Sequence, residues 1–431
     1  MKRAYSIAVI VCVAVLSASV SSQSSEPTGL TPLFDGKTLS NWVVADGQYA
    51  QNFSVRDGLL RVEGTGGWLR SAKQYSDFTL RVEFRYLSED PGGRSGVSGI
   101  YVRTPATTGT YGTGWPGNSV EVQLSNRTGS RTAAPGDPRW GGQVLYHDVD
   151  GGPVTFDTQT ALRTYGTTGE WQTHEIQVIG GAITVLLNDR FLARAYAGPP
   201  ESGYIGLQAE TGAIEFRSIL IKEGAGPIPA RSWEGFVPIF DGKTLNGWKP
   251  ANPESKTFSI KEGGVLSVTG RTAIGTRGGA LPAGTDPGGC MGNLFTEKEY
   301  SDFTLRFEAR FSDGLADSGF LTRVPPDGGA YQIQLQGMGT RDLPWNALLF
   351  RQGGVPQGET TFDYNVALKA YSTVGDWTTY EVQAFGPSMT VKMNGLVVAR
   401  AENVGVLEGK FGFQCEVNTV DLRNIQVREG M

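Results

Sequence analysis

The sequence predicts an all-β protein built from two tandem β-sandwiches. Many short segments alternate apolar and polar residues, whereas few stretches have the apolar spacing of a helix. The 431 residues include 60 glycines, which indicates many turns. In addition, the second half of the chain repeats the first. Because each strand has one apolar face, every half is expected to pack two antiparallel sheets face to face, as a jelly roll does.

The alternation identifies individual strands. In residues 78–84 (FTLRVEF), the phenylalanines, leucine and valine share one face, and threonine, arginine and glutamate share the other. Residues 183–195 (ITVLLNDRFLARA) are predicted to be a hairpin with its turn at Asn-Asp, 188–189. The repeat of this segment has Asn-Gly at 394–395, a strong signal for a two-residue hairpin turn.

The internal repeat spans a whole domain. LFDGKTLSNW at 33–42 returns as IFDGKTLNGW at 239–248, and GEWQTHEIQV at 169–178 returns as GDWTTYEVQA at 375–384, both 206 residues later. Between these ends the offset changes, and it reaches 225 residues for YSDFTLR, which starts at Tyr75. A period of this length is too long for a solenoid repeat, so each copy is expected to fold as a domain with its own loops.

The domain boundaries follow from the repeat. The first domain is predicted to cover residues 30–224 and the second residues 236–431. Between them, residues 225–235 (AGPIPARSWEG) are rich in proline and glycine and are expected to form a short, fairly stiff linker.

The N-terminus has the pattern of a secretory signal peptide, predicted to cover residues 1–25. Lys2 and Arg3 precede an apolar run from Ile7 to about Leu16, and small residues follow. The run is shorter than the ~20 residues that a membrane span needs, and no later stretch approaches that length. We therefore expect a secreted or periplasmic protein without a membrane span.

The formal net charge of −5 argues against nucleic acid as a partner. The sequence does not indicate an oligomeric state. Loss of the signal peptide would leave Cys290 and Cys415, which could form one disulfide in an exported protein but are too few for a disulfide framework. Cys415 shares a face with Phe411 and Phe413, so we expect a small buried residue and two free thiols.

A polar patch is predicted on one sheet of the first domain. In residues 120–124 (VEVQL), Glu121 and Gln123 lie opposite the apolar side chains. Tyr101 and Arg103 alternate in the same way in the preceding strand, so neighbouring strands would bring all four together. Such a patch suits sugar hydroxyl groups and would give Glu121 an arginine partner. The alternative is a solvated outer face with an ordinary cross-strand ion pair.

Further candidates flank this patch. Tyr146 and His147 lie in a glycine-rich segment, residues 141–152, that is expected to be a loop, and a histidine there could act as acid, base or metal ligand. His174 is expected to be a strand residue without a catalytic role, since the second copy has tyrosine there. Trp115 and Trp140 lie in predicted loops and could cover the C–H face of a pyranose.

The ordered motifs resemble a known family. LFDGKTLSNW, SGIYVR, EVQLSN and GYIGLQAETGAIEFRSILIKE are similar to those of the 3-keto-disaccharide hydrolase family, also described as 3-keto-glucoside 1,2-lyase/hydratase domains. The resemblance covers residues 30–224 and again 236–430. It implies a sandwich like that of the concanavalin A-like lectins and glucanases, and a small oligosaccharide or glycoside as substrate.

The resemblance also implies a reaction. A ketone at C3 of the sugar acidifies the hydrogen at C2; a base removes it, the C1 oxygen leaves, and water adds to the product. This route needs a base, an acid and a group that polarises the ketone, and a divalent metal could be that group. Glu121 is then the expected base, Arg103 and Gln123 hold the ketone and adjacent hydroxyls, and Tyr146 or His147 protonates the leaving oxygen.

Some positions depart from the family pattern. Asn126 stands where the family usually has an aspartate, which removes one possible metal ligand, and no two histidines have metal-ligand spacing. In the second copy Gln332 replaces Glu121, and Arg351 is aligned with His147, so only the first domain is expected to be active. Two rival functions stay open: a lectin-like protein without turnover, and a glycosidase, which needs two carboxylates where Glu121 alone is well placed.

Overall fold

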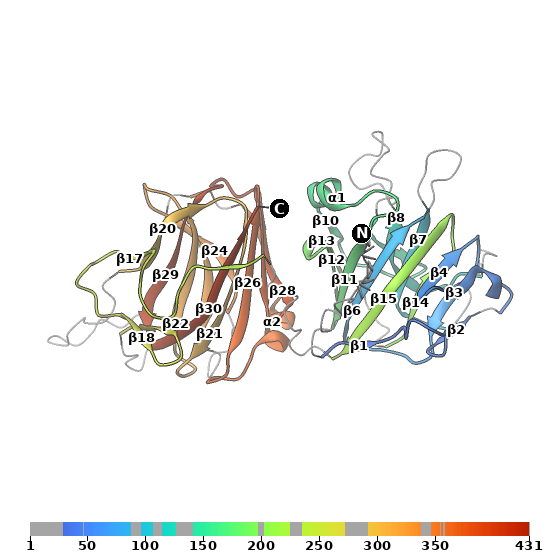
Figure 1. Ribbon diagram of the computed structural model, residues 1–431, viewed down its shortest axis with the longest axis horizontal. Coiled ribbons are helices and arrows are strands. Elements are labelled where there is room, and N and C mark those ends of the chain that lie inside the picture. Colours follow the sequence, from blue (N-terminus) through green and yellow to red (C-terminus); the bar gives the residue numbers. More distant parts are fainter. Residues whose placement is uncertain are drawn as a thin grey trace, which may run out of the picture.

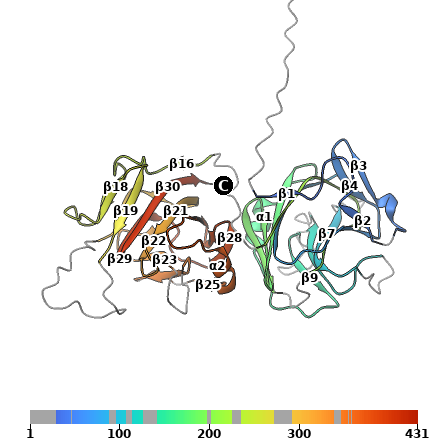
Figure 2. The same ribbon diagram turned by 90° about the horizontal axis from the view of Figure 1, so that it is seen from below.

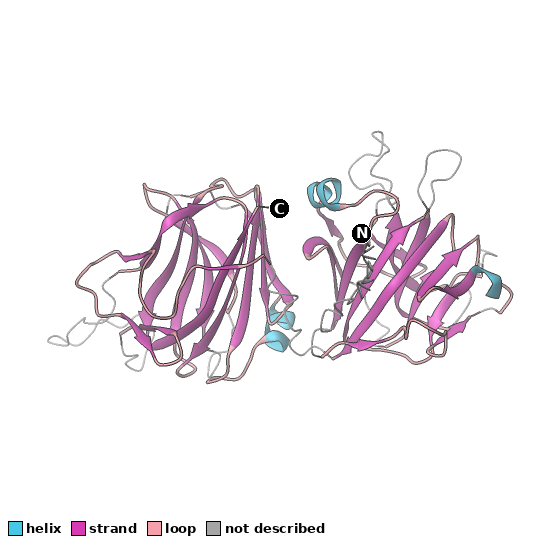
Figure 3. Cartoon of the chain, in the orientation of Figure 1, coloured by secondary structure: helices cyan, strands magenta, loops and turns pink. Residues whose placement is uncertain are grey.

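The computed structural model describes residues 29–430 except 46, 88–95, 107–113, 126–140, 197–201, 225–234, 272–291, 338–345, 354 and 357. The predicted signal peptide, nearly all of the predicted linker, Asn126, Trp140 and Cys290 lie outside this set. Strands are the main secondary structure of the described chain, and they form two sandwiches side by side (Figures 1 and 3). The prediction of an all-β protein with two tandem sandwiches is confirmed.

The first domain pairs a nine-stranded sheet with a six-stranded sheet. In spatial order, the nine-stranded sheet consists of β10 (Thr155–Phe156), β13 (Arg190–Tyr196), β12 (Ala182–Leu187), β11 (Gln172–Ile179), β6 (Phe78–Tyr86), β15 (Ala213–Glu223), β4 (Leu59–Glu63) and β3 (Phe53–Arg56), with β1 (Thr31–Pro32) beside β15. The six-stranded sheet consists of β2 (Trp42–Val44), β5 (Trp68–Ser71), β14 (Tyr204–Gln208), β7 (Val97–Thr104), β8 (Ser119–Ser125) and β9 (Val144–His147).

The second domain repeats this architecture. Its nine-stranded sheet consists of β18 (Phe258–Lys261), β19 (Val265–Thr269), β30 (Thr419–Glu429), β21 (Phe303–Phe311), β26 (Thr378–Phe385), β27 (Ser388–Met393), β28 (Leu396–Glu402) and β25 (Glu359–Phe362), with β16 (Val237–Pro238) beside β30. Its six-stranded sheet consists of β17 (Trp248–Pro250), β20 (Leu294–Tyr300), β29 (Gly409–Val417), β22 (Asp317–Val324), β23 (Ala330–Gln336) and β24 (Leu349–Gln352).

The apolar faces of the two sheets meet inside each domain. In the first domain Phe78, Leu80, Val82 and Phe84, all from the predicted segment 78–84, belong to one buried cluster. Val120, Val122 and Leu124 reach the same cluster from the six-stranded sheet, as the alternation predicts. The polar side chains of β8 therefore point to the other face of that sheet.

Two short helices occupy equivalent places in the repeats, α1 (Thr158–Thr164) and α2 (Tyr364–Ala370). Each begins after an aspartate that caps it: Asp157 accepts from the backbone N–H of Thr160 at 2.9 Å, and Asp363 from that of Val366 at 3.0 Å. There is also a 3-10 turn, η1 (Ala50–Asn52). None of the helices in the described part of the chain is long and apolar enough to span a bilayer.

Cys415 departs from expectation. It is buried, as predicted, but it is disulfide-bonded. The prediction of two free thiols is therefore wrong for this residue. An alternating pattern indicates which face a cysteine occupies, but it does not reveal whether the sulfur atom is bonded to another.

His174 lies in β11 with none of its surface exposed, as expected for a strand residue. Its Nε2 atom lies 2.8 Å from the hydroxyl of Tyr165. Burial in the core lowers the pKa of His174 to about 3, because the imidazolium form would lose its hydration.

This lowered pKa makes the stability of the first domain depend on pH. Below about pH 6.5 the unfolded chain binds a proton at His174 that the folded chain does not accept, so stability is lost as the pH falls. Between pH 6.5 and 5 we expect the wild type to lose about 2 kcal/mol of unfolding free energy more than His174→Gln. Urea unfolding of both proteins at the two pH values measures this difference, and equal losses would contradict it.

Candidate functional site

The candidate site lies on the six-stranded sheet of the first domain, on the face away from the core. Strand β8 pairs with β7 on one side and with β9 on the other. Glu121 is opposite Tyr101 in β7, and Ser119 is opposite His147 in β9. Because side chains alternate between faces, Tyr101, Glu121, Gln123 and His147 share the same face.

Glu121 and His147 form a direct pair, with Oε2 of the carboxylate 2.8 Å from Nε2 of the ring. His147 is the last residue of β9. The glycine content of residues 141–152 had suggested a loop, so that prediction is wrong for His147. Gly99, in β7, makes room for the carboxylate, since a Cβ atom at this position would lie 1.9 Å from Oε1 of Glu121. The positions of Glu121 and His147 are therefore fixed by the three neighbouring strands β7, β8 and β9.

The two members of the pair differ in exposure. Glu121 is 1% exposed, whereas the side chain of His147 is 31% exposed. Oε1 of Glu121 has no hydrogen-bond partner among the described residues. The solvent-facing member of the pair is therefore the histidine.

Each member shifts the pKa of the other. Burial raises the pKa of Glu121, and the hydrogen bond with His147 opposes that rise. The hydrogen bond with Glu121 raises the pKa of His147, and burial opposes this second rise. The imidazole is therefore a stronger base than a free histidine side chain.

Aromatic side chains extend the site along the sheet. The Tyr101 ring lies edge-on to that of His147, with 6.5 Å between the ring centroids, and Trp68 lies edge-on to Tyr101 at 5.7 Å. Gly206 leaves room for both rings, because a Cβ atom there would lie 2.4 Å from an atom of Trp68. Burial raises the pKa of Tyr101 well above its ordinary value, so the phenol is a hydrogen-bond donor near neutral pH.

Three residues of this site were missed in the sequence: Trp68, Gln208 and Glu210. Gln208, at the end of β14, lies close enough to Tyr101 to act on the pKa of its phenol. The negative charge of Glu210 acts on both Tyr101 and His147. The last two had a signal, since Gln-x-Glu recurs at 208–210 and 414–416 in the two copies.

Arg103 does not belong to the site, contrary to prediction. Its φ angle is 47°, so the alternation of β7 is broken there. The guanidinium group pairs with Asp77 at 2.8 Å and donates to the carbonyl of Ser76 at 2.7 Å and to that of Gly180. Arg103 thus ties β7 to two loops instead of facing Glu121.

Tyr146 is also excluded from the site. It lies opposite Val120, on the core side of the sheet, and its hydroxyl donates to the carbonyl of Tyr196 at 2.9 Å. Gln123 shares the face of Glu121 and is 6% exposed. Trp115 is half-buried, with its indole N–H donating to the carbonyl of Ala209 at 3.0 Å, next to Glu210.

The described residues of the site do not form a suitable ligand set for a divalent metal. Within the described ranges, no three His, Cys, Asp or Glu side chains are grouped so that they could hold a metal ion. Glu121 and His147 supply two such groups, already bonded to each other. We therefore derive no step through a metal.

Comparison with protein families identifies the fold's relatives. A model of the 3-keto-alpha-glucoside-1,2-lyase-like domain matches residues 29–222 and again residues 235–428. The chain belongs to this family. The suspected resemblance, with its two tandem copies, is confirmed. Each half of this 3-keto-alpha-glucoside-1,2-lyase-like protein is thus a domain of a carbohydrate-active family.

Solved structures similar to this 3-keto-alpha-glucoside-1,2-lyase-like protein each cover about one domain. The "putative glycosyl hydrolase" of Parabacteroides distasonis ATCC 8503 has a TM-score of 0.36 and 17% identity, over 46% of this chain and 94% of that chain. A carbohydrate binding module of Bacillus subtilis has a TM-score of 0.30 and 16% identity, over 42% of this chain and 96% of that chain. The β-glucanase of Bacillus licheniformis has a TM-score of 0.29 and 14% identity, over 46% of this chain and 99% of that chain. No protein of curated function matches the chain.

The second 3-keto-alpha-glucoside-1,2-lyase-like domain has a neutral version of the pair. In the pairing of β23 with β24, Gln352 occupies the position of His147, so the alignment with Arg351 is wrong by one residue. Gln352 donates to Gln332, which replaces Glu121. A pair of amides keeps the hydrogen bond but accepts no proton near neutral pH.

Proposed function

We propose that the first domain cleaves 3-keto-glycosides by elimination followed by hydration, and that the protein is exported. The observation that carries this proposal is the pair of buried Glu121 and partly exposed His147 on the sheet face of a 3-keto-alpha-glucoside-1,2-lyase-like domain. A carboxylate bonded to one ring nitrogen leaves the other nitrogen free to exchange protons with a substrate.

In the proposed reaction His147 is the proton-transfer group. We assign the proton of Nε2 to the bond with Glu121, so Nδ1 carries the lone pair that removes the hydrogen from C2. The electron pair of the C–H bond forms the enolate of the C3 ketone. The enolate then expels the oxygen at C1, which takes the proton from Nδ1. Addition of water across the new C1–C2 double bond completes net hydrolysis.

Glu121 acts here as a positioning residue and not as the base expected from the sequence. Its carboxylate is too deeply buried to contact C2 directly, but it holds the ring and stabilises the imidazolium formed during the reaction. Tyr101 and Gln208 are about as deeply buried as Glu121, so we assign them to the support of the pair and not to substrate contact. Gln123 keeps its proposed role in hydroxyl binding.

The proposal predicts the pH dependence of catalysis. Neutral imidazole is the reactive form, and Glu121 raises the pKa of His147, so kcat/KM should rise with pH in a limb above the ordinary value of about 6.5. In Glu121→Gln the residual activity should show this limb at lower pH, since the carboxylate that raises the pKa is gone. A limb that does not move would contradict the role of the pair.

A second candidate is a direct glycosidase, which the charge of Glu210 beside His147 favours. Glu210 would then supply one of the two carboxylates that such an enzyme needs. Incubation with 3-keto-trehalose and with trehalose separates the candidates. Turnover of the keto sugar alone supports elimination, and cleavage of trehalose supports the glycosidase. Binding of either sugar without turnover would indicate a lectin and overturn both.

A further inference from the structure

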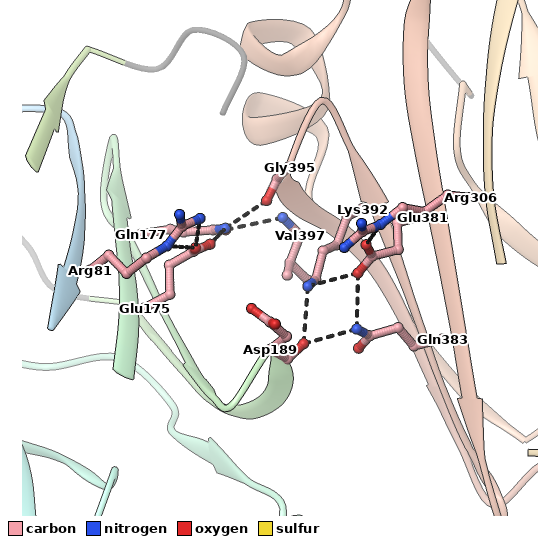
Figure 4. A network of polar contacts seen from close by, with 10 residues as sticks. All are labelled: Arg81, Glu175, Gln177, Asp189, Arg306, Glu381, Gln383, Lys392, Gly395 and Val397. Carbon is pink, nitrogen blue, oxygen red and sulfur yellow. Dashed lines mark hydrogen bonds and ion pairs between the residues drawn. The ribbon is translucent and has the colours of Figure 1, made fainter. Parts of the chain in front are cut away.

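The two domains bind each other through equivalent residues. Gln177 of β11 donates to the carbonyl of Gly395 at 2.7 Å, and Gln383 of β26 donates to the carbonyl of Asp189 at 2.9 Å (Figure 4). In each case the acceptor lies in the hairpin turn of the opposite domain. Both glutamines and both turns are 206 residues apart, the offset of the repeat. The two contacts are therefore copies of one contact.

A pair of ion pairs shows the same reciprocity. Arg400 lies 2.7 Å from Asp157, and Arg194 lies 3.7 Å from Asp363. Arginines and aspartates are again separated by 206 residues. Each aspartate caps the helix of its own domain with one oxygen and meets the arginine of the other domain with its second. All four side chains of these pairs are at most 9% exposed.

An apolar contact fills the space between the polar groups. Leu186 and Phe191 of the first domain form a buried cluster with Val397 of the second. The guanidinium group of Arg400 lies 3.6 Å from the centroid of the Phe191 ring. The N–H of Val397 donates to Gln177 at 3.0 Å. Strands β12 and β13 of the first domain thus lie on the side that faces β28 of the second (Figure 1), and the view from below shows α1 and β28 on these adjoining sides (Figure 2).

The arginines beneath this contact form ion pairs within their own domains. Arg81 pairs with Glu175 at 2.7 Å, and Arg306 pairs with Glu381. One difference breaks the symmetry: Lys392 of the second domain stands where the first has leucine. Lys392 lies 2.9 Å from Glu381 and donates to the carbonyl of Asp189 at 3.0 Å. The bond from Lys392 to Asp189 therefore strengthens the contact at the hairpin turn of the first domain, and among the described residues the other turn has no counterpart to it.

Reciprocal use of one surface is the property of an isologous interface, in which residue i of one copy meets residue j of the other and the reverse. We propose that this face, defined by Asp157, Gln177, Asp189, Arg194 and their repeats in the second domain, is a self-recognition surface of the domain. Its occupant is a second copy of the same domain, which this chain supplies in tandem. The two halves consequently hold together without the peptide that joins them.

The test uses the full chain with a protease site inserted within residues 225–234. After cleavage, size-exclusion chromatography with light scattering should show both fragments together at the mass of the uncut chain. Arg194→Asp and Arg400→Asp should each weaken the association of the cut halves by about 30-fold or more, because each reverses a buried charge in one of the two repeat-related ion pairs. Both variants are compared before cleavage by circular dichroism and thermal unfolding, so loss of folding is distinguished from loss of contact.

Arg217→Asp and Arg423→Asp are the matched controls. These arginines are also 206 residues apart, but each pairs with a glutamate of its own domain, so the cut halves should stay associated. Wild-type fragments that separate after cleavage would overturn the proposal. So would a cut chain in which only one of the two interface variants weakens the association, since the contact would then not be reciprocal.

Discussion

Glu121→Gln is expected to lower kcat/KM for a 3-keto-glycoside by about 10²- to 10⁴-fold, the range that positioned proton transfer contributes. The amide is nearly the same size as the carboxylate and can still hydrogen-bond to His147. It cannot stabilise the imidazolium ion, and it allows the ring to adopt the other tautomer. Because substrate contacts are retained, most of the loss should lie in kcat and little in KM. Steady-state kinetics with 3-keto-trehalose measures both.

The second domain offers the control for this variant. Gln332 occupies the position of Glu121 in the pairing of β22 with β23. Gln332→Ala should leave kcat/KM unchanged if the first domain alone carries the activity. Full activity of Glu121→Gln would sink the proposed function, and a large loss in Gln332→Ala would show that the amide pair takes part in turnover.

Arg103→Met is expected to lower the free energy of unfolding by about 2–4 kcal/mol while kcat/KM changes little. Arg103 has a 12% exposed side chain and pairs with Asp77, and it donates to two backbone carbonyls that its removal would leave without this donor. Methionine keeps the aliphatic part of the side chain but none of its hydrogen bonds. Chemical unfolding and steady-state kinetics under folding conditions separate the two effects.

Arg217→Met is a suitable comparison for Arg103→Met, since its ion pair with Glu83 is solvent-exposed. Such a pair contributes about 1 kcal/mol or less. If Arg103→Met instead raised KM strongly without a loss of stability, the arginine would contact substrate as the sequence had suggested. Arg323 of the second domain has the same conformation, with φ of 50°, and also donates to loop carbonyls, which supports a structural role for both.

The errors in the predicted site have a common physical origin. Period-2 alternation places Glu121 and Gln123 correctly because β8 is regular over its whole length. It fails at Arg103, where a positive φ angle turns the side chain away. It also cannot indicate that β9 brings His147 opposite Ser119, since strand pairing joins residues far apart in the sequence. Glu210 was missed although Gln-x-Glu recurs in both copies, because the repeat by itself does not place the residue near His147.

Fold class, tandem organisation and family could be derived from local patterns, because alternation, turn residues and a 206-residue repeat are properties of short segments. The position of the acidic residue at 121 also followed from its own strand. The identity of its partner, His147 instead of Arg103, did not follow from the sequence. Register across strands, burial of Glu121 beneath His147, and the reciprocal contact between the domains arise from pairing and packing over long separations, which leave no local mark in the chain.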